Sequence, residues 1–167
     1  MTESVTISYL EMHNPNELLL KPCNDPDFTI KEAEIKQWQI NKCFYQAVGG
    51  DWRWRDRLGW TDAEWMQYAE ADNLRTFIAY KGGTPAGYYE LQKTEDRAVE
   101  IKCLGLLPKF IGKGYGRELI RHAIRSGWDW DARRVWLNTC TNDHPNALRT
   151  YLATGLKLYK QEQKCSK

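Results

Sequence analysis

Three closely spaced glycines are the part of this sequence that most directly predicts chemistry. The stretch PKFIGKGYGREL places Gly112, Gly114 and Gly116 between an apolar run and a run typical of a helix. Such glycines let the backbone approach a ligand, and the unpaired amides that open the following helix favour an anion. Lys113 and Arg117 add positive charge. The stretch predicts a phosphate-binding loop, with a flexible corner as the structural alternative.

The two best-known phosphate motifs do not fit this loop. The spacing GxxxxGK(S/T) of a P-loop is absent, and in the dinucleotide pattern GxGxxG the third glycine position falls on Arg117 or Leu119. Spacing alone therefore leaves the ligand of the loop open.

Cysteine and histidine offer little further chemistry. The five cysteines are scattered, odd in number and form no CxxC pair, so we expect reduced, mostly structural thiols. With three scattered histidines we expect no metal site. Cys140 could be considered as an acyl-cysteine nucleophile, but no histidine stands in a supporting motif.

The elements that must position the loop alternate between strands and helices. VTISYLEM alternates in polarity and predicts a strand. Thr29 with Glu32, and Thr61 with Glu64, have the spacing of capping boxes and predict helices ending near Val48 and Ala71. A meander of three strands follows, in LRTFIAYKGGTPAGYYELQK and RAVEIKCLGLL. After the glycine loop we expect helix, strand, short helix and final strand.

Composition limits the class of protein. The chain has 167 residues, 42% of them hydrophobic, which suits a single domain over residues 1–167. A net charge of +2 argues against a protein built to coat nucleic acid. Neither a secretory signal nor an apolar run long enough to span a membrane is visible, so we expect a soluble, cytoplasmic protein.

The glycine loop in its context resembles the GNAT superfamily of N-acetyltransferases. Their acetyl-coenzyme A motif, (Q/R)-x-x-G-x-(G/A), follows a strand that ends in an apolar-x-Pro element. In LLPKFIGKGYG, Gly114 and Gly116 take the two small-residue positions and Ile111 stands where Gln or Arg is usual.

Further motifs extend the resemblance. Ala147, Tyr151 and Gly155, followed by Leu156, have the family's spacing on a late helix, with His144 where the family often has Asn. The runs GLLPKFIGKGYG and TCTNDHPNAL, with an upstream W-x-W-x-x-R, look like one bacterial subgroup. The strong match covers residues 97–158, and the earlier half matches mainly in the order of its elements.

The resemblance implies a fold and a cosubstrate. The expected fold is mixed α/β (α+β), with a mostly antiparallel central sheet flanked by helices and a splayed parallel strand pair, about 97–107 and 133–139, forming the acetyl-coenzyme A cleft. A backbone N–H near Leu106 would polarise the thioester carbonyl. The implied coenzyme contacts are Leu104, Leu106, Leu107, Ile111, Gly112, Lys113, Gly114, Tyr115, Gly116, Arg117, His144, Asn146, Ala147 and Tyr151.

The implied reaction is direct attack of an amine on the thioester, which needs a base and an acid. Glu100, on the first splayed strand, is the candidate base, and strict alternation places it on the face opposite Cys103. Glu90, on the neighbouring strand, is the reserve candidate. Tyr151 matches the family tyrosine that protonates the coenzyme A sulfur. The alternatives are a solvated glutamate, a core tyrosine and, for His144 and Asn146, a capping role.

The tryptophan-rich segment GGDWRWRDRLGW falls where GNAT folds place part of the acceptor wall. Trp52, Trp54 and Trp60 could line a pocket, with Asp51 or Asp56 attracting a cationic amine. Packing of a loop, a nucleic-acid stacking platform using the interleaved arginines, and dimerisation are the alternatives. Substrate contacts are assigned to Trp52, Trp54, Trp60, Glu90 and Asn138.

We therefore predict an N-acetyltransferase that uses acetyl-coenzyme A, without a metal, to acetylate a small-molecule or peptide amine. The protein would be a monomer or homodimer without nucleic-acid or membrane partners. The rival hypotheses are a non-catalytic acyl-coenzyme A-binding or sensing domain, and an RNA-binding protein that uses the tryptophan segment. The identity of the acceptor amine is not readable from the sequence.

Overall fold

The computed structural model of the protein describes residues 3–165. Its strands are β1 (Ser4–Met12), β2 (Phe28–Glu32), β3 (Leu74–Lys81), β4 (Thr84–Lys93), β5 (Ala98–Leu106), β6 (Arg134–Cys140) and β7 (Lys157–Cys165). Its helices are α1 (Trp38–Gly49), α2 (Asp62–Ala69), α3 (Tyr115–Asp129) and α4 (Ala147–Ala153). Single 3-10 turns lie at Pro15–Glu17, Gly50–Trp52 and Pro108–Phe110.

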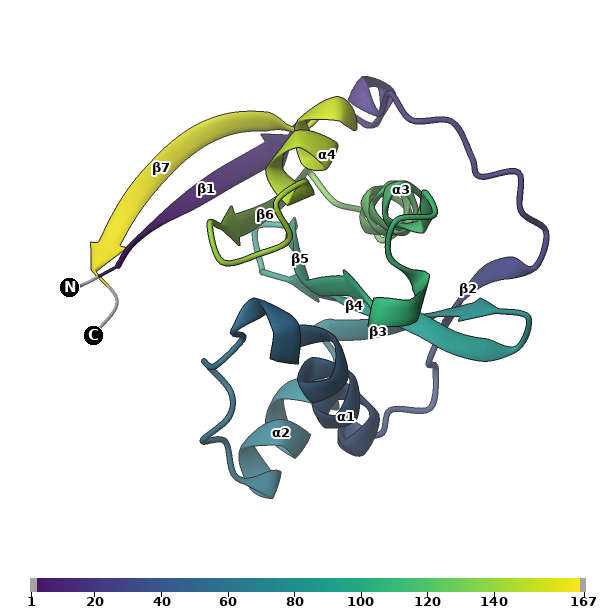
Figure 1. Ribbon diagram of the computed structural model, residues 1–167, viewed down its shortest axis with the longest axis vertical. Coiled ribbons are helices and arrows are strands. Elements are labelled where there is room, and N and C mark those ends of the chain that lie inside the picture. The colour runs from purple at the N-terminus through teal and green to yellow at the C-terminus, as the bar shows by residue number, and fades with distance from the viewer. Residues whose placement is uncertain (1–2, 166–167) are drawn as a thin grey trace.

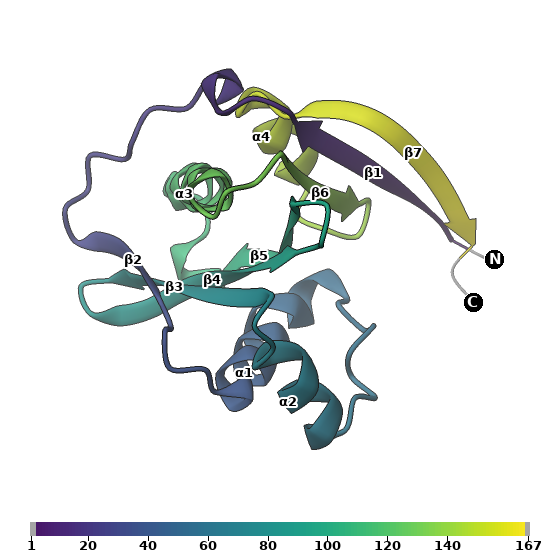
Figure 2. The ribbon, with the colours of Figure 1, turned by 180° about the vertical axis from the view of Figure 1, so that it is seen from behind.

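All seven strands form one sheet in the order β2-β3-β4-β5-β6-β1-β7. Neighbouring strands are antiparallel except β5 and β6, which are parallel. Helices α1 and α2 lie against one face of the sheet, and α3 and α4 against the other (Figures 1 and 2). The expected fold class, with one parallel pair in a mostly antiparallel sheet, is confirmed.

The local sequence explains the best-predicted helices. On α3 the apolar residues Leu119, Ile120, Ala123 and Ile124 recur at helical spacing and are fully buried against the sheet. Thr61 caps α2 as expected, since its hydroxyl accepts from the Glu64 amide while the Glu64 carboxylate accepts from the Thr61 amide.

The capping box predicted at Thr29 and Glu32 is wrong. Both residues belong to β2, where Thr29 lies opposite Tyr80 and Glu32 opposite Phe77 of β3. The first long helix begins only at Trp38, although it ends near the expected glycine pair. The backbone of the segment FTIKE is hydrogen-bonded to β3 as a strand. The threonine-to-glutamate spacing of a capping box therefore does not distinguish the start of a helix from a strand.

The parallel strands separate soon after they pair. Only three residue pairs join β5 to β6, ending at Glu100 opposite Trp136. Beyond this point β5 contains a β-bulge, because Glu90 lies opposite Lys102 but Tyr88 lies opposite Gly105. Within the bulge Cys103 adopts a left-handed φ of 55°. The bend directs β5 away from β6 and opens the sheet between them.

Candidate active site

A cleft of about 1200 Å³ lies where the two parallel strands diverge. Its walls come from β5, β6, the glycine loop with the start of α3, the β6–α4 loop with α4, and the α1–α2 loop. The residues assigned to the site from the sequence that line it are Trp52, Trp54, Trp60, Glu100, Leu104, Leu106, Ile111, Gly112, Gly114, Gly116, Arg117, Asn138, His144, Asn146, Ala147 and Tyr151. Asp56 and Cys140, which were also considered, line it as well.

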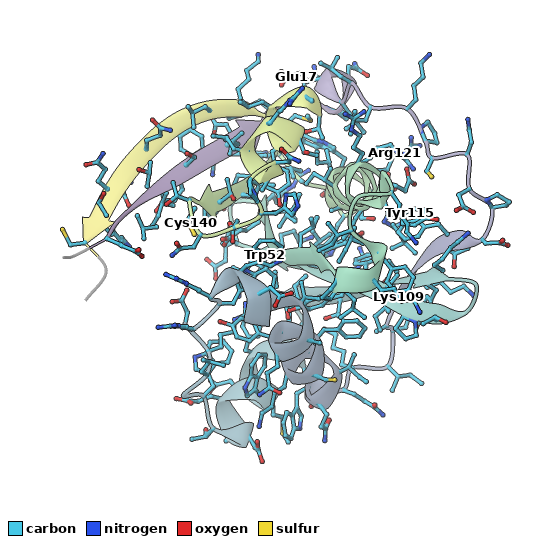
Figure 3. The ribbon with its side chains drawn as sticks, viewed as in Figure 1. Glu17, Trp52, Lys109, Tyr115, Arg121 and Cys140 are labelled. Atoms are coloured by element: carbon cyan, nitrogen blue, oxygen red, sulfur yellow. The ribbon has the colours of Figure 1, made fainter. Side chains whose placement is uncertain are left out.

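Four predicted site residues do not line the cleft: Glu90, Leu107, Lys113 and Tyr115. Tyr115 stacks on Phe28, with ring centroids 4.3 Å apart, and its hydroxyl donates to Asp25 at 2.6 Å. Figure 3 shows Tyr115 on the β2 side of the molecule, away from Trp52 and Cys140. Cys103, expected opposite Glu100, does line the cleft because the bulge interrupts the alternation.

The edge of β5 that faces β6 is open along the cleft. The Leu107 amide donates to the Ala86 carbonyl of β4 at 2.8 Å, so it is not available to hydrogen-bond a ligand in the cleft. Because backbone N–H groups alternate between the two edges of a strand, the Leu106 N–H is directed to the opposite edge, toward the cleft. Leu106, and not Leu107, therefore offers a free backbone donor there.

The glycine loop has a backbone that other residues adopt poorly. Gly112 and Gly114 have φ values of 83° and 86°, in the left-handed region, and Gly114 is the N-cap of α3. No side chain caps this helix, so the first amides of α3 keep their donor capacity at the positive end of the helix dipole. Arg117 lines the cleft in the first turn of α3, and Arg149, which the sequence did not single out, lines it from α4.

Glu100 lies on the cleft wall just where the strands part, with its side chain 18% exposed. Burial raises the pKa of its carboxyl above the usual value, and the nearby charges of Lys102 and Arg57 oppose that rise. The Lys102 ammonium is 3.6 Å from the Glu100 carboxylate. Glu100 is thus a partly buried carboxylate with a raised pKa in a cleft, which is an arrangement suited to a general base.

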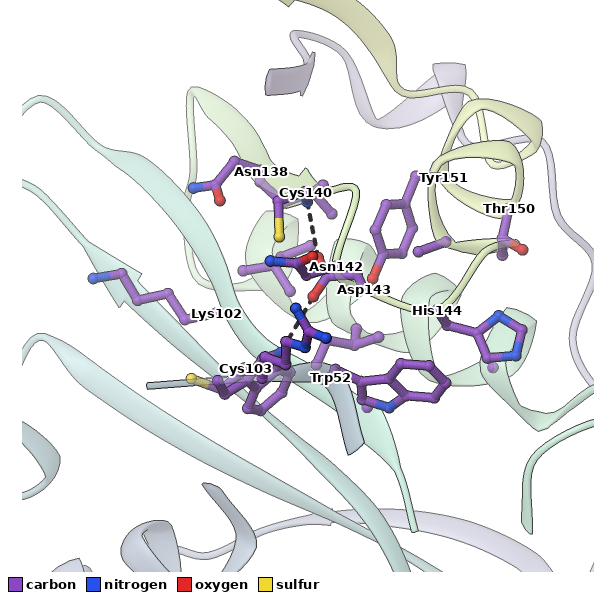
Figure 4. A pocket seen from close by; sticks show the side chains of 18 of the residues that line it. Trp52, Lys102, Cys103, Asn138, Cys140, Asn142, Asp143, His144, Thr150 and Tyr151 are labelled. Atoms are coloured by element: carbon purple, nitrogen blue, oxygen red, sulfur yellow. Dashed lines mark hydrogen bonds between the residues drawn. The ribbon is translucent and has the colours of Figure 1, made fainter. Parts of the chain in front are cut away.

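Tyr151 approaches the cleft from α4, and its ring is directed toward Asp143 (Figure 4). Burial and then the charge of Asp143 raise the pKa of the Tyr151 hydroxyl, which keeps it protonated. Asp143 is itself held in the β6–α4 loop, accepting from the Thr139 hydroxyl at 2.6 Å and the Cys140 amide at 2.9 Å. It lines the cleft, and the sequence did not single it out.

His144 takes part in capping α4 and also lies on the wall of the cleft. Its Nδ1 accepts from the Asn146 amide at 3.1 Å and its carbonyl accepts from the Ala147 amide at 2.8 Å, so it helps to begin α4. Its ring also packs edge-on against Trp52, with centroids 5.2 Å apart, at the wall of the cleft (Figure 4).

The tryptophan segment both packs and lines the cleft. Trp60 contacts Trp65 and Tyr68 edge-on, with centroid distances of 5.0 and 5.2 Å. Trp54 packs on Tyr45 and donates its indole N–H to Asp143 at 3.3 Å. The packing and pocket interpretations are therefore compatible.

Arg57 and Glu90 form a buried ion pair beneath this segment. The Arg57 guanidinium is 3.0 Å from the Glu90 carboxylate, and their side chains are 9% and 0% exposed. Glu90 also accepts from Asn41 at 2.8 Å and Tyr68 at 2.7 Å. Burial is the largest single influence and lowers the pKa of the Arg57 guanidinium, but the Glu90 carboxylate together with Cys103, Tyr68 and Tyr88 raises that pKa on balance. Glu90 is thus enclosed by donors, so of the two candidate glutamates only Glu100 lines the cleft.

The arginine is also enclosed by aromatic rings. Its guanidinium carbon lies 4.2 Å from the Tyr68 ring centroid, 5.0 Å from Trp60 and 5.4 Å from Tyr45. A cation that lies above the face of an aromatic ring is stabilised by such contacts. The buried Arg57 is not exposed to a phosphate backbone, and exposed Arg53 pairs with Glu3 at 3.2 Å.

Among residues 3–165, no helix is both long and apolar enough to cross a membrane. No group of three or more His, Cys, Asp or Glu side chains in this range is arranged to hold a metal ion.

Solved structures share this fold. A GCN5-related N-acetyltransferase from Kribbella flavida superposes with a TM-score of 0.65 at 18% identity, covering 93% of this chain and 56% of that one. One from Sphaerobacter thermophilus gives 0.67 at 15% identity, covering 94% and 49%. The class of fold is therefore that of the GCN5-related N-acetyltransferases.

Sequence comparison identifies the family to which the chain belongs. Uncharacterized N-acetyltransferases of Mycobacterium bovis and Mycobacterium tuberculosis are 32% identical over 98 residues, which are 59% of this chain. The match spans 62% of the length of these curated relatives. The profile of the acetyltransferase (GNAT) family matches residues 33–156. The chain belongs to the GNAT acetyltransferase family.

Proposed function

We propose that this protein transfers the acetyl group of acetyl-coenzyme A to a primary amine of a small molecule or peptide, by direct attack within a ternary complex. The observation that carries the proposal is that one cleft combines a raised-pKa carboxylate, a protonated tyrosine and an uncapped helix start. These are the base, the acid and the anion site that this reaction needs.

The residues present suit acetyl-coenzyme A. The left-handed glycines and free first amides of α3 suit its pyrophosphate, with Arg117 and Arg149 adding charge. The open edge of β5 offers backbone groups to an extended amide-containing arm, as another strand would. When bound, the cosubstrate supplies a thioester whose carbonyl carbon accepts the amine. The Leu106 N–H is our candidate donor to the oxygen of that carbonyl.

Glu100 removes a proton from the incoming amine, directly or through one water. A lysine-like amine with a pKa near 10.4 costs about 4 kcal/mol to deprotonate at pH 7.4, at about 1.36 kcal/mol per unit. A carboxylate whose pKa is raised by burial is the stronger base for that step. The charge of Lys102, 3.6 Å from the Glu100 carboxylate, favours the ionised form that accepts the proton.

Tyr151 supplies a proton to the departing thiolate. Its hydroxyl stays protonated because burial and the charge of Asp143 disfavour the phenolate. It reaches the cleft from α4, across from the β5 wall that carries Glu100. Trp52, Trp54, Trp60 and Asn138 would form the acceptor side.

The test is turnover of acetyl-coenzyme A against a panel of amines, with mass detection of the acetylated product. Glu100→Gln and Tyr151→Phe should each lower kcat/KM about 10²- to 10⁴-fold while coenzyme A still binds. Glu95→Gln, on the exposed β4–β5 turn, and Tyr80→Phe are the matched controls and should retain activity.

The same panel separates the rival functions. Calorimetric binding of coenzyme A without turnover of any amine would favour a sensing domain. Salt-sensitive RNA binding with no coenzyme A binding would favour an RNA-binding protein. Full turnover by both Glu100→Gln and Tyr151→Phe would overturn the assigned roles while leaving acetyl transfer intact.

A further inference from the structure

The glycine loop has few side chains with which to fix its own position. Gly112, Lys113 and Gly114 are exposed, and both glycines adopt a left-handed φ. Glycine has no side chain that could hold such a turn by packing. The next residue, Tyr115, begins α3 and is buried. The position of the loop therefore depends on how the first turn of α3 is held.

Tyr115 is directed away from the cleft, although the residues on either side of it line the cleft. Gly114 and Gly116 are both in the cleft wall. The Tyr115 ring instead stacks on Phe28 of β2, with centroids 4.3 Å apart and ring planes 6° from parallel. Its hydroxyl donates to the Asp25 carboxylate at 2.6 Å. The residue that begins α3 is thus joined to the far edge of the sheet.

The edge of the sheet holds Asp25 in place. Its carboxylate accepts from the Lys81 ammonium at 2.8 and 3.1 Å and from the Asp27 amide at 3.0 Å. Lys81 belongs to β3 and lies opposite Phe28. The hydrogen bonds from Lys81 and Tyr115 lower the pKa of Asp25 to about 2, so the carboxylate is ionised at neutral pH. Tyr115 therefore donates to a charged acceptor, which makes the stronger kind of hydrogen bond.

A second contact reaches the same helical turn from the same segment, residues 23–28. The Cys23 amide donates to the Glu118 carboxylate at 2.9 Å, and Arg121 donates to that carboxylate at 2.7 and 2.9 Å. Tyr115 and Glu118 are three residues apart, so they share a face of α3. The chain that leads into β2 passes along α3 (Figures 1 and 2). Neither residue lines the cleft, so the 23–28 segment holds the first turn from outside it.

We propose that Tyr115 and Asp25 are positioning residues for coenzyme A, because their hydrogen bond fixes the direction of the first amides of α3. This inference rests on the proposed function, in which those amides bind the pyrophosphate. Hydrogen bonds weaken steeply as donor and acceptor lose alignment, so a small tilt of the first turn reduces the affinity for an anion. The hydrogen bond is already present in the free protein, which reduces the ordering that binding requires.

Tyr115→Phe and Asp25→Asn test the contact with little change of shape. Phenylalanine keeps the ring on Phe28 but cannot donate, and asparagine keeps an acceptor of similar size without the charge. Each should raise the dissociation constant of coenzyme A about 5-fold or more in calorimetry. The matched controls are Tyr80→Phe on β3 and Asp27→Asn, in the same segment with a side chain 73% exposed. Both controls should bind coenzyme A with native affinity.

Steady-state kinetics separate positioning from a general loss of stability. Tyr115→Phe and Asp25→Asn should raise KM for acetyl-coenzyme A, with kcat at saturating acetyl-coenzyme A and KM for the acceptor close to native. A variant that only contained less folded protein would instead show a lower kcat at unchanged KM. The double variant should bind coenzyme A about as weakly as the weaker single variant, because both substitutions act on one hydrogen bond.

Hydrogen exchange provides a readout outside the cleft. If the contact favours binding of coenzyme A, binding must favour the contact by the same factor. No residue of the 23–28 segment lines the cleft. Coenzyme A should nevertheless slow hydrogen exchange in this segment of the native chain, and it should do so less in Tyr115→Phe.

The outcomes distinguish this inference from the proposed function. A native chain that does not bind coenzyme A overturns the proposed function and this inference with it. Native affinity for coenzyme A in both Tyr115→Phe and Asp25→Asn overturns the inference alone. Strictly additive losses of affinity in the double variant also overturn it, since they would show that the two side chains act separately.

Discussion

The indole N–H of Trp54 donates to the carboxylate of Asp143 at 3.3 Å, joining two loops on opposite walls of the cleft. Trp54 lies between α1 and α2, and Asp143 lies 89 residues later between β6 and α4. The neighbouring contact between Trp52 and His144 joins the same two loops. Together these contacts form a bridge over the opening between β5 and β6.

Trp54→Phe should weaken the contact between the two loops while an aromatic ring still fills the position. Phenylalanine keeps an aromatic ring against Tyr45 but cannot donate to Asp143. We expect the free energy of unfolding to fall by about 1 kcal/mol. We also expect KM for the acceptor to rise several-fold with kcat little changed. Steady-state kinetics and urea unfolding measure both, with Trp38→Phe, which lies outside the cleft lining, as control. A fall in kcat at constant KM would instead place the hydrogen bond in the chemical step.

Arg57→Met should destabilise the fold severely, because it leaves the fully buried Glu90 carboxylate without its cation. Breaking a buried ion pair from one side costs about 3–5 kcal/mol. Arg55→Met, in the same loop but exposed, should change the free energy of unfolding little. Adding Glu90→Gln to Arg57→Met should recover part of the loss, because the neutral amide needs no cation. Strictly additive losses in this double-mutant cycle would contradict the coupling.

Gly114→Ala should weaken coenzyme A binding through backbone strain alone. A Cβ at this position would meet no atom within 4 Å, yet the φ of 86° lies in the left-handed region. That conformation costs about 1–2 kcal/mol for other residues, equivalent to about 5- to 30-fold in affinity. Calorimetry with coenzyme A measures it. Gly59→Ala, also with open space around it but without a left-handed φ, is the matched control. Unchanged affinity would move the pyrophosphate site away from this loop.

The raised pKa of Glu100 predicts opposite effects on activity and stability. Activity needs the carboxylate, so kcat/KM should fall as pH drops through the raised pKa. Folding favours the protonated form, so this group's contribution to stability is full below its unfolded pKa and is lost as pH rises through the folded pKa. Glu100→Gln should therefore be more stable than the native chain at neutral pH.

That stability difference should vanish at acidic pH, where both states of the native chain carry a protonated Glu100. Urea unfolding from neutral pH down to about 4 tests this, the lower limit being near the usual carboxyl pKa. Glu95→Gln, on the exposed turn, should show no such trend. A Glu100→Gln protein that is less stable than native at neutral pH would mean that the Lys102 contact outweighs burial.

Local patterns predicted the parts of the site that depend on local geometry. The apolar stripe of α3 and the capping box at Thr61 involve residues within one or two helical turns, and both are present. The glycine loop precedes α3 as expected, because left-handed turns need glycine whatever surrounds them. The same kind of pattern gave a wrong cap at Thr29, where pairing with β3 prevailed.

Features that depend on distant partners were missed. Arg57 resembled its exposed neighbours Arg53 and Arg55 in sequence, and only the fold places it against Glu90, 33 residues away. Glu90 stayed in reserve as a base behind Glu100, because burial of a strand carboxylate depends on the helices that cover it. The bulge at Cys103 has no side-chain signature, so strict alternation assigned that residue to the wrong face.

The position of β1 has a consequence for how the sheet is assembled. β1 lies between β6 and β7, so the first strand of this sheet to be synthesised has both of its partners among the last. It stays unpaired while more than a hundred residues are added, because Ser8 lies opposite Thr139 and Gln161. In the complete sheet Ser4 lies beside Cys165. A short linker from Cys165 to Ser4, with the chain opened at the exposed Gly82-Gly83 turn, would therefore place β1 next in synthesis to the strands that it joins.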